Sequence, residues 1–146
     1  MGWQVCHGGA RQRSFTPAGC GDEEYLQVFQ EIVVPIADRY GPEWILVSAG
    51  FDPHRRDPLG GMNVTERGFA AMAALLIELA RRHAGGRIAF LLEGGYDLVG
   101  LKISVASVLQ EMAQKGQGEL PAGPTEGKIQ PLIRKLLQLQ ERYWPV

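Results

Sequence analysis

Two short apolar runs, separated by a long amphipathic stretch, constrain the fold of this chain more than any other feature. The runs are WILVSAG at residues 44–50 and RIAFLL at residues 87–92, and each is typical of a buried strand. Between them Thr65 is placed to cap a helix that reaches about His83, with an inward face made of Phe69, Met72, Leu76 and Leu79. Strand, crossover helix and strand form a βαβ unit, whose strands are parallel and joined right-handedly. Because neither run alternates with polar residues, we expect both faces of each strand to be covered.

Apolar periodicity predicts three further helices, over residues 22–40, 98–112 and 129–143. Asp22 is the expected N-cap of the first helix, and Pro35 should kink that helix or end its regular part. The inner face of the second is expected to carry Leu101, Val105, Val108 and Met112. Residues 114–127 are rich in Gly, Pro and polar groups, as is typical of a flexible linker. The order of elements predicts an α/β fold.

Composition narrows the class of protein. The 146 residues suit one domain with a real core, and the net charge of -1 leaves no basic excess for direct binding of nucleic acid or of an anionic membrane. Residues 1–15 lack the apolar core of a secretory signal, and the stretch FAAMAALLIELA is interrupted by Glu78 and too short to span a bilayer. Cys6 and Cys20 make no disulfide framework. We therefore expect a cytoplasmic protein.

Two unusual loops follow the predicted strands, FDPHRRDPLGG after the first and EGGYD after the second. Ligands bind outside the carboxyl ends of parallel strands, so Asp52 and Tyr96 are expected on the same rim. The Asp52 carboxylate suits a cation such as zinc, or else it accepts backbone N–H bonds within its own loop. The two glycines before Tyr96 permit backbone angles that project its phenol into a cleft, where a phenol can donate a hydrogen bond to an oxyanion. The alternative is an ordinary tyrosine at the rim.

The remaining candidates have simpler structural interpretations. His54 is a second ligand only if the strand continues past Pro53, which a proline disfavours. Asp57-Pro58 and Gly60-Gly61 are typical of turns. Cys6-His7 is a candidate metal pair, although it lies in a segment without periodicity.

The segment VSAGFDPHRRDPLGGMNVTERGFA, followed at the right distance by LLEGGYD, resembles the zinc-dependent histone deacetylase superfamily. The likeness is to its class II and bacterial branch, which includes acetylpolyamine amidohydrolases and acetoin-utilisation proteins. PAGCGDEEYLQVFQEIVVPI and the terminal YWPV are similar as well, so the resemblance covers residues 16–146, whereas residues 1–15 are atypical. It implies the C-terminal part of a three-layer αβα fold with a parallel sheet, similar to that of arginase.

The resemblance also implies roles for individual residues. Asp52 matches a zinc ligand, and Tyr96 matches the catalytic tyrosine that hydrogen-bonds the scissile carbonyl and then the tetrahedral oxyanion. Leu59 matches a residue that lines the acyl-lysine tunnel, and part of the tunnel wall is matched by Gly94 and Gly95. His54 matches a position that does not bind the metal.

Two parts of the family's catalytic centre have no counterpart in this chain. The family places an Asp-x-His zinc pair and a His-His dyad, which supplies the general base, upstream of the matched region. Upstream of Asp52 this chain has only His7, and its other histidines are His54 and His83, so no His-His dyad occurs. One carboxylate does not complete a zinc site, and a metal-bound water without a base has no proton acceptor.

The combined expectation is the C-terminal part of a zinc-dependent deacetylase that hydrolyses acetyl-amide bonds of lysine-like or polyamine amines. By itself this chain should be inactive, with zinc bound weakly or not at all. The alternative is a non-catalytic remnant of the fold that acts through self-association or partner binding. In either case the expected partner is a second copy of the chain or a complementing N-terminal fragment.

Overall fold

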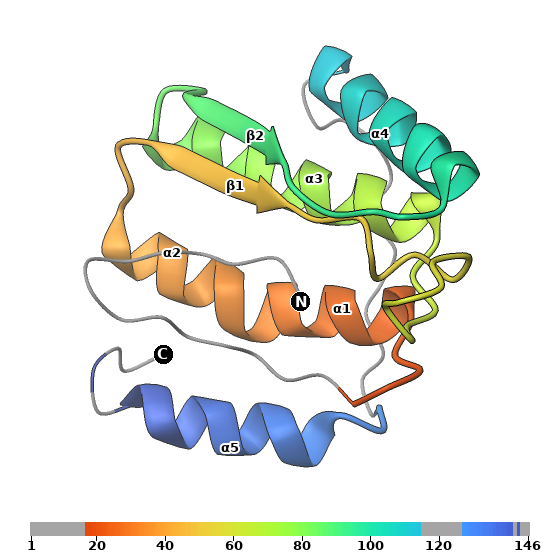
Figure 1. Cartoon of the computed structure of the whole chain (residues 1–146). Helices are drawn as coiled ribbons and strands as arrows, with labels where there is room; N and C mark the ends of the chain where they lie inside the picture. The colour runs from red at the N-terminus through yellow and green to blue at the C-terminus, as the bar shows by residue number, and fades with distance from the viewer. Residues whose placement is uncertain (1–16, 115–126, 142, 144–146) are drawn as a thin grey trace.

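The computed structural model describes residues 17–114, 127–141 and 143, and the fold is α/β, as predicted (Figure 1). Along the chain the elements are α1 (Asp22–Val28), the π-helical turn η1 (Phe29–Val33), α2 (Val34–Tyr40), β1 (Ile45–Ala49), α3 (Glu66–His83), β2 (Ile88–Leu92), α4 (Leu98–Ala113) and α5 (Gln130–Glu141). Most of the predicted linker, like the N-terminal residues up to 16, lies outside the described residues.

The two strands are parallel, which confirms the predicted βαβ unit. Ile45 is in register with Ile88 and Ala49 with Leu92. Pairing continues beyond the strand ends, because the N–H of Glu93 donates to the carbonyl of Ala49 at 3.1 Å and the N–H of Phe51 donates to that of Gly94 at 2.8 Å. These two bonds hold the loops after β1 and β2 side by side, so the carboxyl ends of the strands form a common rim.

The expectation that both faces of the strands are covered is wrong for the described part of the chain. Val47 and Ala49 are buried, and Figure 1 shows α3 behind the two strands. On the other side Leu46 and Leu91 are 65% and 53% exposed. The sequence of these strands is that of a doubly covered sheet, but the described helices cover one face only. An open apolar surface is the result.

The first helix continues through Pro35 by widening its turn just before it. A proline cannot donate an N–H, and its ring clashes with the carbonyl four residues earlier. Here the π-helical turn η1 precedes the proline, which lies in the first turn of α2. The helix ends at Gly41, whose φ of 63° is left-handed and favours glycine.

The sequence predicted Asp22 as the N-cap of α1, and this prediction is wrong, because Gly21 takes that position. The N–H of Gly21 donates to the Glu24 carboxylate at 2.7 Å. The Asp22 carboxylate instead accepts two bonds from Thr65, from its N–H at 2.7 Å and from its hydroxyl at 2.6 Å. Thr65 is the predicted cap of α3, so Asp22 ties the start of α1 to the start of α3.

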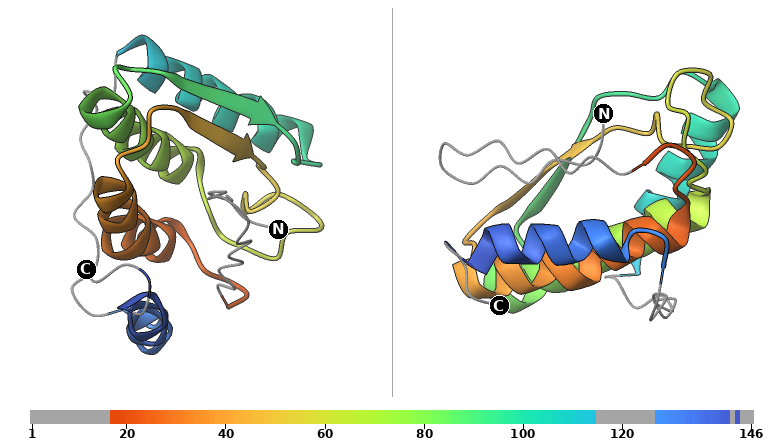
Figure 2. Two further views of the ribbon diagram at one scale, coloured as in Figure 1. Left: turned by 90° about the vertical axis from the view of Figure 1, so that its left-hand side faces the viewer. Right: turned by 90° about the horizontal axis from the view of Figure 1, so that it is seen from below.

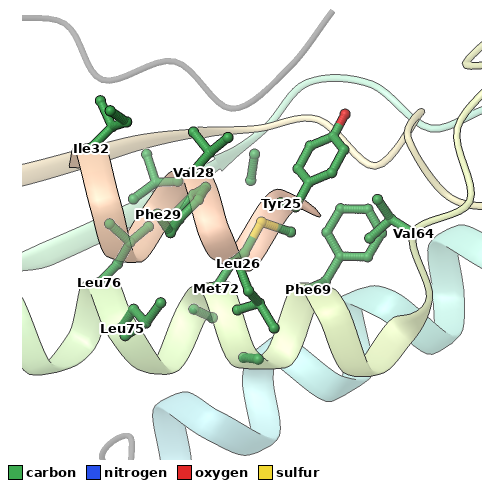
Figure 3. Close-up of a cluster of buried hydrophobic side chains, with 14 of the residues drawn as sticks. Tyr25, Leu26, Val28, Phe29, Ile32, Val64, Phe69, Met72, Leu75 and Leu76 are labelled. Carbon is green, nitrogen blue, oxygen red and sulfur yellow. The ribbon is translucent and has the colours of Figure 1, made fainter. Parts of the chain in front are cut away.

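The core lies between α3 and the helix formed by α1, η1 and α2, and the views in Figure 2 show α5 alongside the outer face of that helix. Figure 3 shows Phe69 and Met72 of α3 facing Tyr25 and Phe29, with Val64 beside them. All four predicted inward residues of α3 are buried. On α4 Val108 is buried as predicted, but Met112 is 38% exposed, so the inner face of this helix is shorter than its periodicity suggested.

We expect Phe69→Ala to destabilise the chain by about 3–5 kcal/mol, because Phe69 is fully buried and its removal leaves a cavity. The Phe51 and Phe69 rings lie 5.0 Å apart, so their contact is lost as well. Denaturant unfolding followed by circular dichroism measures the change. The matched control is Leu98→Ala, at a side chain that is 80% exposed, for which a change within about 0.5 kcal/mol is expected. Equal losses for the two variants would contradict this account of the core.

Candidate functional site

Asp52 lies one residue beyond the last bond between the strands, and its side chain is enclosed by glycines. The residue is 7% exposed. A Cβ on Gly50 would lie 2.8 Å from the Asp52 Oδ1, and one on Gly94 would lie 2.7 Å from the same atom. Neither position therefore accepts a larger residue without moving the carboxylate. The two glycines leave room for a buried acidic group at the rim.

Tyr96 follows β2 in the neighbouring loop, and its side chain is 57% exposed. The preceding Gly95 has a φ of 129°, a value that L residues rarely adopt. A Cβ at Gly95 would lie 3.0 Å from Leu101 and 3.1 Å from Phe51, so the loop is also tightly packed there. Of the two glycines, Gly95 has the unusual backbone that the sequence suggested. It carries the chain from the strand into an exposed tyrosine.

Leu59 lies in the turn after Asp57-Pro58 and is 72% exposed. Gly94 packs against Asp52, and Gly95 against Phe51. The three residues matched to the acyl tunnel therefore lie in the same two loops as Asp52 and Tyr96. A lining role for Leu59, Gly94 and Gly95 stays a prediction.

His54 is a packed residue in the described structure. It is 1% exposed, and its Nδ1 accepts the backbone N–H of Arg56 at 3.2 Å. Its Nε2 is 3.8 Å from the Glu66 carboxylate, and its ring stacks on that of Phe69 with centroids 6.4 Å apart. A Cβ on Gly100 would approach Nδ1 to 2.5 Å, so α4 closes over the ring. These contacts give His54 a structural role in the loop.

Asp57 has a role that the sequence did not reveal. Its Oδ1 accepts the N–H groups of Leu59 at 2.9 Å and Gly60 at 3.2 Å, as expected of an aspartate in a turn. Its Oδ2 accepts the N–H of Tyr96 at 2.6 Å, from the other loop. Burial raises the pKa of Asp57, but the bonds from these N–H groups and from that of Asp97 outweigh burial and hold its pKa below the usual range. Asp57 therefore stays ionised at neutral pH.

A second ionic contact joins the loops at the surface. The Nε of Arg56 lies 3.0 Å from the Oδ1 of Asp97, which also accepts the N–H of Gly100 at 2.6 Å and caps α4. The bond from Gly100 and then the bond from Arg56 hold the pKa of Asp97 below its usual range. Arg56 and Asp97 add to the contacts between the rim loops.

The described residues do not make up a zinc site by themselves. A catalytic zinc needs three protein ligands of the His, Cys, Asp or Glu type. Within residues 17–114, 127–141 and 143, no three such side chains are placed to hold one metal ion. Asp52 offers one carboxylate at the rim, and Cys6 and His7 lie outside the described residues. Further ligands are needed before the site suits zinc.

No helix in the described part of the chain combines the length and the apolar character needed to cross a membrane.

Comparison with protein families gives a match over most of the chain. The family model described as "Histone deacetylase domain" matches residues 7–112. Histone deacetylase 15 of Arabidopsis thaliana is 35% identical over 130 residues, which is 87% of this chain and 23% of the relative. Histone deacetylase 10, chloroplastic, of Oryza sativa subsp. japonica is 45% identical over 94 residues, or 64% of this chain and 21% of the relative. The chain thus spans less than a quarter of each of these two relatives.

Solved structures agree with the family match. The HDA15 HD domain superposes with a TM-score of 0.75 at 33% identity, over 88% of this chain and 33% of that one. The histone deacetylase Clr3 superposes with a TM-score of 0.78 at 30% identity, over 88% of this chain and 21% of that one. The fold described here therefore corresponds to one part of a longer chain in both structures.

Proposed function

Because this chain belongs to the histone deacetylase family, we propose that it is the C-terminal portion of a zinc-dependent deacetylase, inactive as this chain alone. The proposed reaction is hydrolysis of the acetyl-amide bond of a lysine-like or polyamine amine. The observation that carries the proposal is the position of Asp52, whose buried carboxylate lies against Gly94, two residues before Tyr96. An acidic ligand and a phenol thus follow neighbouring parallel strands.

Each residue has a proposed role in the assembled centre. Asp52 supplies one of the zinc ligands. The Tyr96 phenol donates a hydrogen bond to the amide carbonyl oxygen, and this bond strengthens as the oxygen becomes an oxyanion. Leu59, Gly94 and Gly95 line the passage for the acyl-lysine side chain. The exposure of Tyr96 and Leu59 supports these roles, because groups that meet a substrate must be accessible from the rim.

The proposed inactivity follows from the groups that this chain lacks. General-base catalysis needs a side chain that accepts the proton of the attacking water. In the family this is the His-His dyad, and no adjacent histidines occur in this sequence. His54 is no substitute, because it is buried with its Nδ1 already bonded to the Arg56 N–H. The missing groups would come from an N-terminal portion of the domain.

A second candidate function is that of a non-catalytic remnant that acts by self-association or by binding a partner. The exposed leucines on the outer face of the strands favour it, since an apolar surface of this kind is usually covered by another protein segment. Acetyl-lysine hydrolysis after addition of an N-terminal portion separates the candidates, because only the first predicts activity.

We expect the isolated chain to bind zinc only weakly, with no saturable binding at micromolar zinc. The reason is that a single carboxylate does not complete a tetrahedral shell. Isothermal titration calorimetry of the purified chain measures this, with Asp52→Ala as the comparison. Tight one-to-one binding that survives Asp52→Ala would contradict the proposed role of Asp52, and Cys6 and His7 would then be the next candidates.

A further inference from the structure

One carboxylate joins the two rim loops directly. Asp57 lies in the loop after β1, and both of its oxygens are used as acceptors. One oxygen bonds the N–H groups of Leu59 and Gly60 in its own turn, and the other bonds the N–H of Tyr96 at 2.6 Å. The bonds to an ionised carboxylate are about twice as strong as bonds between neutral groups. The same side chain therefore fixes the shape of the first loop and holds the backbone of the second.

The backbone of Tyr96 needs such a contact because a glycine precedes it. Glycine has the widest choice of backbone angles, so it leaves the direction of the next residue poorly determined. Gly95 adopts a φ of 129°, and the Tyr96 side chain is 57% exposed, so packing restrains this side chain little. The bond to Asp57 acts on the first backbone atom after Gly95. It limits where the phenol can lie.

We propose that Asp57 is a positioning residue that joins the two rim loops and holds the Tyr96 phenol at the catalytic centre. The proposal rests on the proposed function for the role of Tyr96, but the contact itself is tested without any activity. Asp57 need not touch the substrate to act in this way. Its effect reaches the reaction through the Tyr96 backbone.

Arg56 provides a matched comparison, because it also links the two loops. Its bond to Asp97 is on the surface, where the arginine side chain is 50% exposed. Exposed ion pairs contribute little, since water competes for both partners. If Asp57 has a special role, loss of Arg56 must have a much smaller effect on Tyr96 than loss of Asp57.

The test is residue-resolved hydrogen–deuterium exchange on the purified full chain and on its Asp57→Ala, Asp57→Asn and Arg56→Ala variants. In Asp57→Ala we expect exchange of the Tyr96 and Asp97 amides to rise about tenfold to a hundredfold, together with that of Leu59 and Gly60. The amides of Phe51 and Glu93 are internal controls, because they bond the backbone across the strand ends and should not change. Arg56→Ala should raise exchange at Tyr96 by less than about fivefold.

Asp57→Asn tests the contact between the two rim loops with a side chain of the same shape. Asparagine keeps one acceptor oxygen, so it serves only one of the loops, and we expect faster exchange in the other. A rise confined to Leu59 and Gly60 in the alanine variant would reduce Asp57 to a local turn residue. If exchange at Phe51 and Glu93 rises as much as exchange at Tyr96 in Asp57→Ala and Asp57→Asn, the substitutions loosen the whole region. If Arg56→Ala raises exchange at Tyr96 as much as Asp57→Ala does, Asp57 has no special role. Each of these three results overturns the proposal.

The exchange result and the proposed function fail in different ways. If Tyr96→Phe leaves the acetyl-lysine hydrolysis of a completed domain unchanged, the proposed function is wrong, although the Asp57 contact can still be confirmed. If exchange at Tyr96 is insensitive to Asp57, the positioning role is wrong, although Tyr96 can still be catalytic.

Discussion

Purified alone, the chain is expected to hydrolyse a fluorogenic acetyl-lysine substrate no faster than its Tyr96→Phe variant. The physical reason is that water attack on an amide needs both a proton acceptor and stabilisation of the oxyanion. In Tyr96 this chain offers a candidate for stabilising the oxyanion. The only histidine in the described rim loops, His54, is buried, so it is not available as the proton acceptor. Initial rates at saturating substrate, with zinc added, measure the difference. Turnover clearly above the Tyr96→Phe rate would contradict the expectation.

The second arm of that experiment supplies the missing groups. When the chain is combined with the N-terminal portion of a related deacetylase domain, we expect hydrolysis to appear. In this mixture Tyr96→Phe should lower the rate about 10²–10³-fold, which is typical for loss of one oxyanion donor. Asp52→Asn should also lower it, whereas Leu139→Ala on α5 serves as a control at an exposed side chain far from the rim in sequence. A mixture that stays inactive would favour the non-catalytic remnant.

The isolated chain is also expected to self-associate, with a homodimer as the main soluble form. Leu46 and Leu91 are exposed on the outer face of the strands, and Trp44 just before β1 is 62% exposed. Burying a leucine contributes about 1.5–3 kcal/mol, so an uncovered face of this kind favours contact with a second copy. Within the described residues each strand has one neighbour, and the free edges add backbone groups that can pair. Size exclusion coupled to light scattering should give twice the monomer mass of 16.0 kDa.

Charge on the outer face should abolish this association. In the Leu46→Glu/Leu91→Glu double variant we expect a monomer, because dimerisation would now bury two carboxylates per chain. The matched control is Leu139→Glu on α5, where the side chain is 58% exposed but away from the strands, and here the dimer should persist. A wild-type chain that is monodisperse at 16.0 kDa and unfolds cooperatively would show that the face needs no partner.

Local sequence patterns predicted most of the fold. The two apolar runs became β1 and β2 with parallel pairing, and Thr65 caps α3 as its position suggested. These features depend on residues close in sequence, such as a cap and the turn it bonds, or on a connection with only one favourable hand. Pattern also put Asp52 and Tyr96 beyond the carboxyl ends of neighbouring strands.

Pattern predicted less well where burial depends on the surroundings. Leu46 and Leu91 belong to apolar runs of the kind found in covered strands, yet both are exposed in the described structure. Met112 continues the apolar face of α4, yet it is 38% exposed. Apolar character indicates which side chains gain from burial. It does not indicate whether a neighbouring element is present to bury them.

The sequence by itself determined the parallel βαβ unit, the candidate residues at its rim and the likeness to histone deacetylases. Only the tertiary structure decided that Asp57 bonds the N–H of Tyr96, 39 positions away, and that Asp22 bonds Thr65, 43 positions away. Each aspartate had a local interpretation in the sequence, Asp57 as a turn residue and Asp22 as a helix cap, but the structure shows only the turn, because Gly21 caps α1. A carboxylate has two oxygens and about four acceptor sites, and a local motif need not use them all. The packing that brings two segments together decides which distant groups bond to the carboxylate. The periodicity of either segment does not predict those partners.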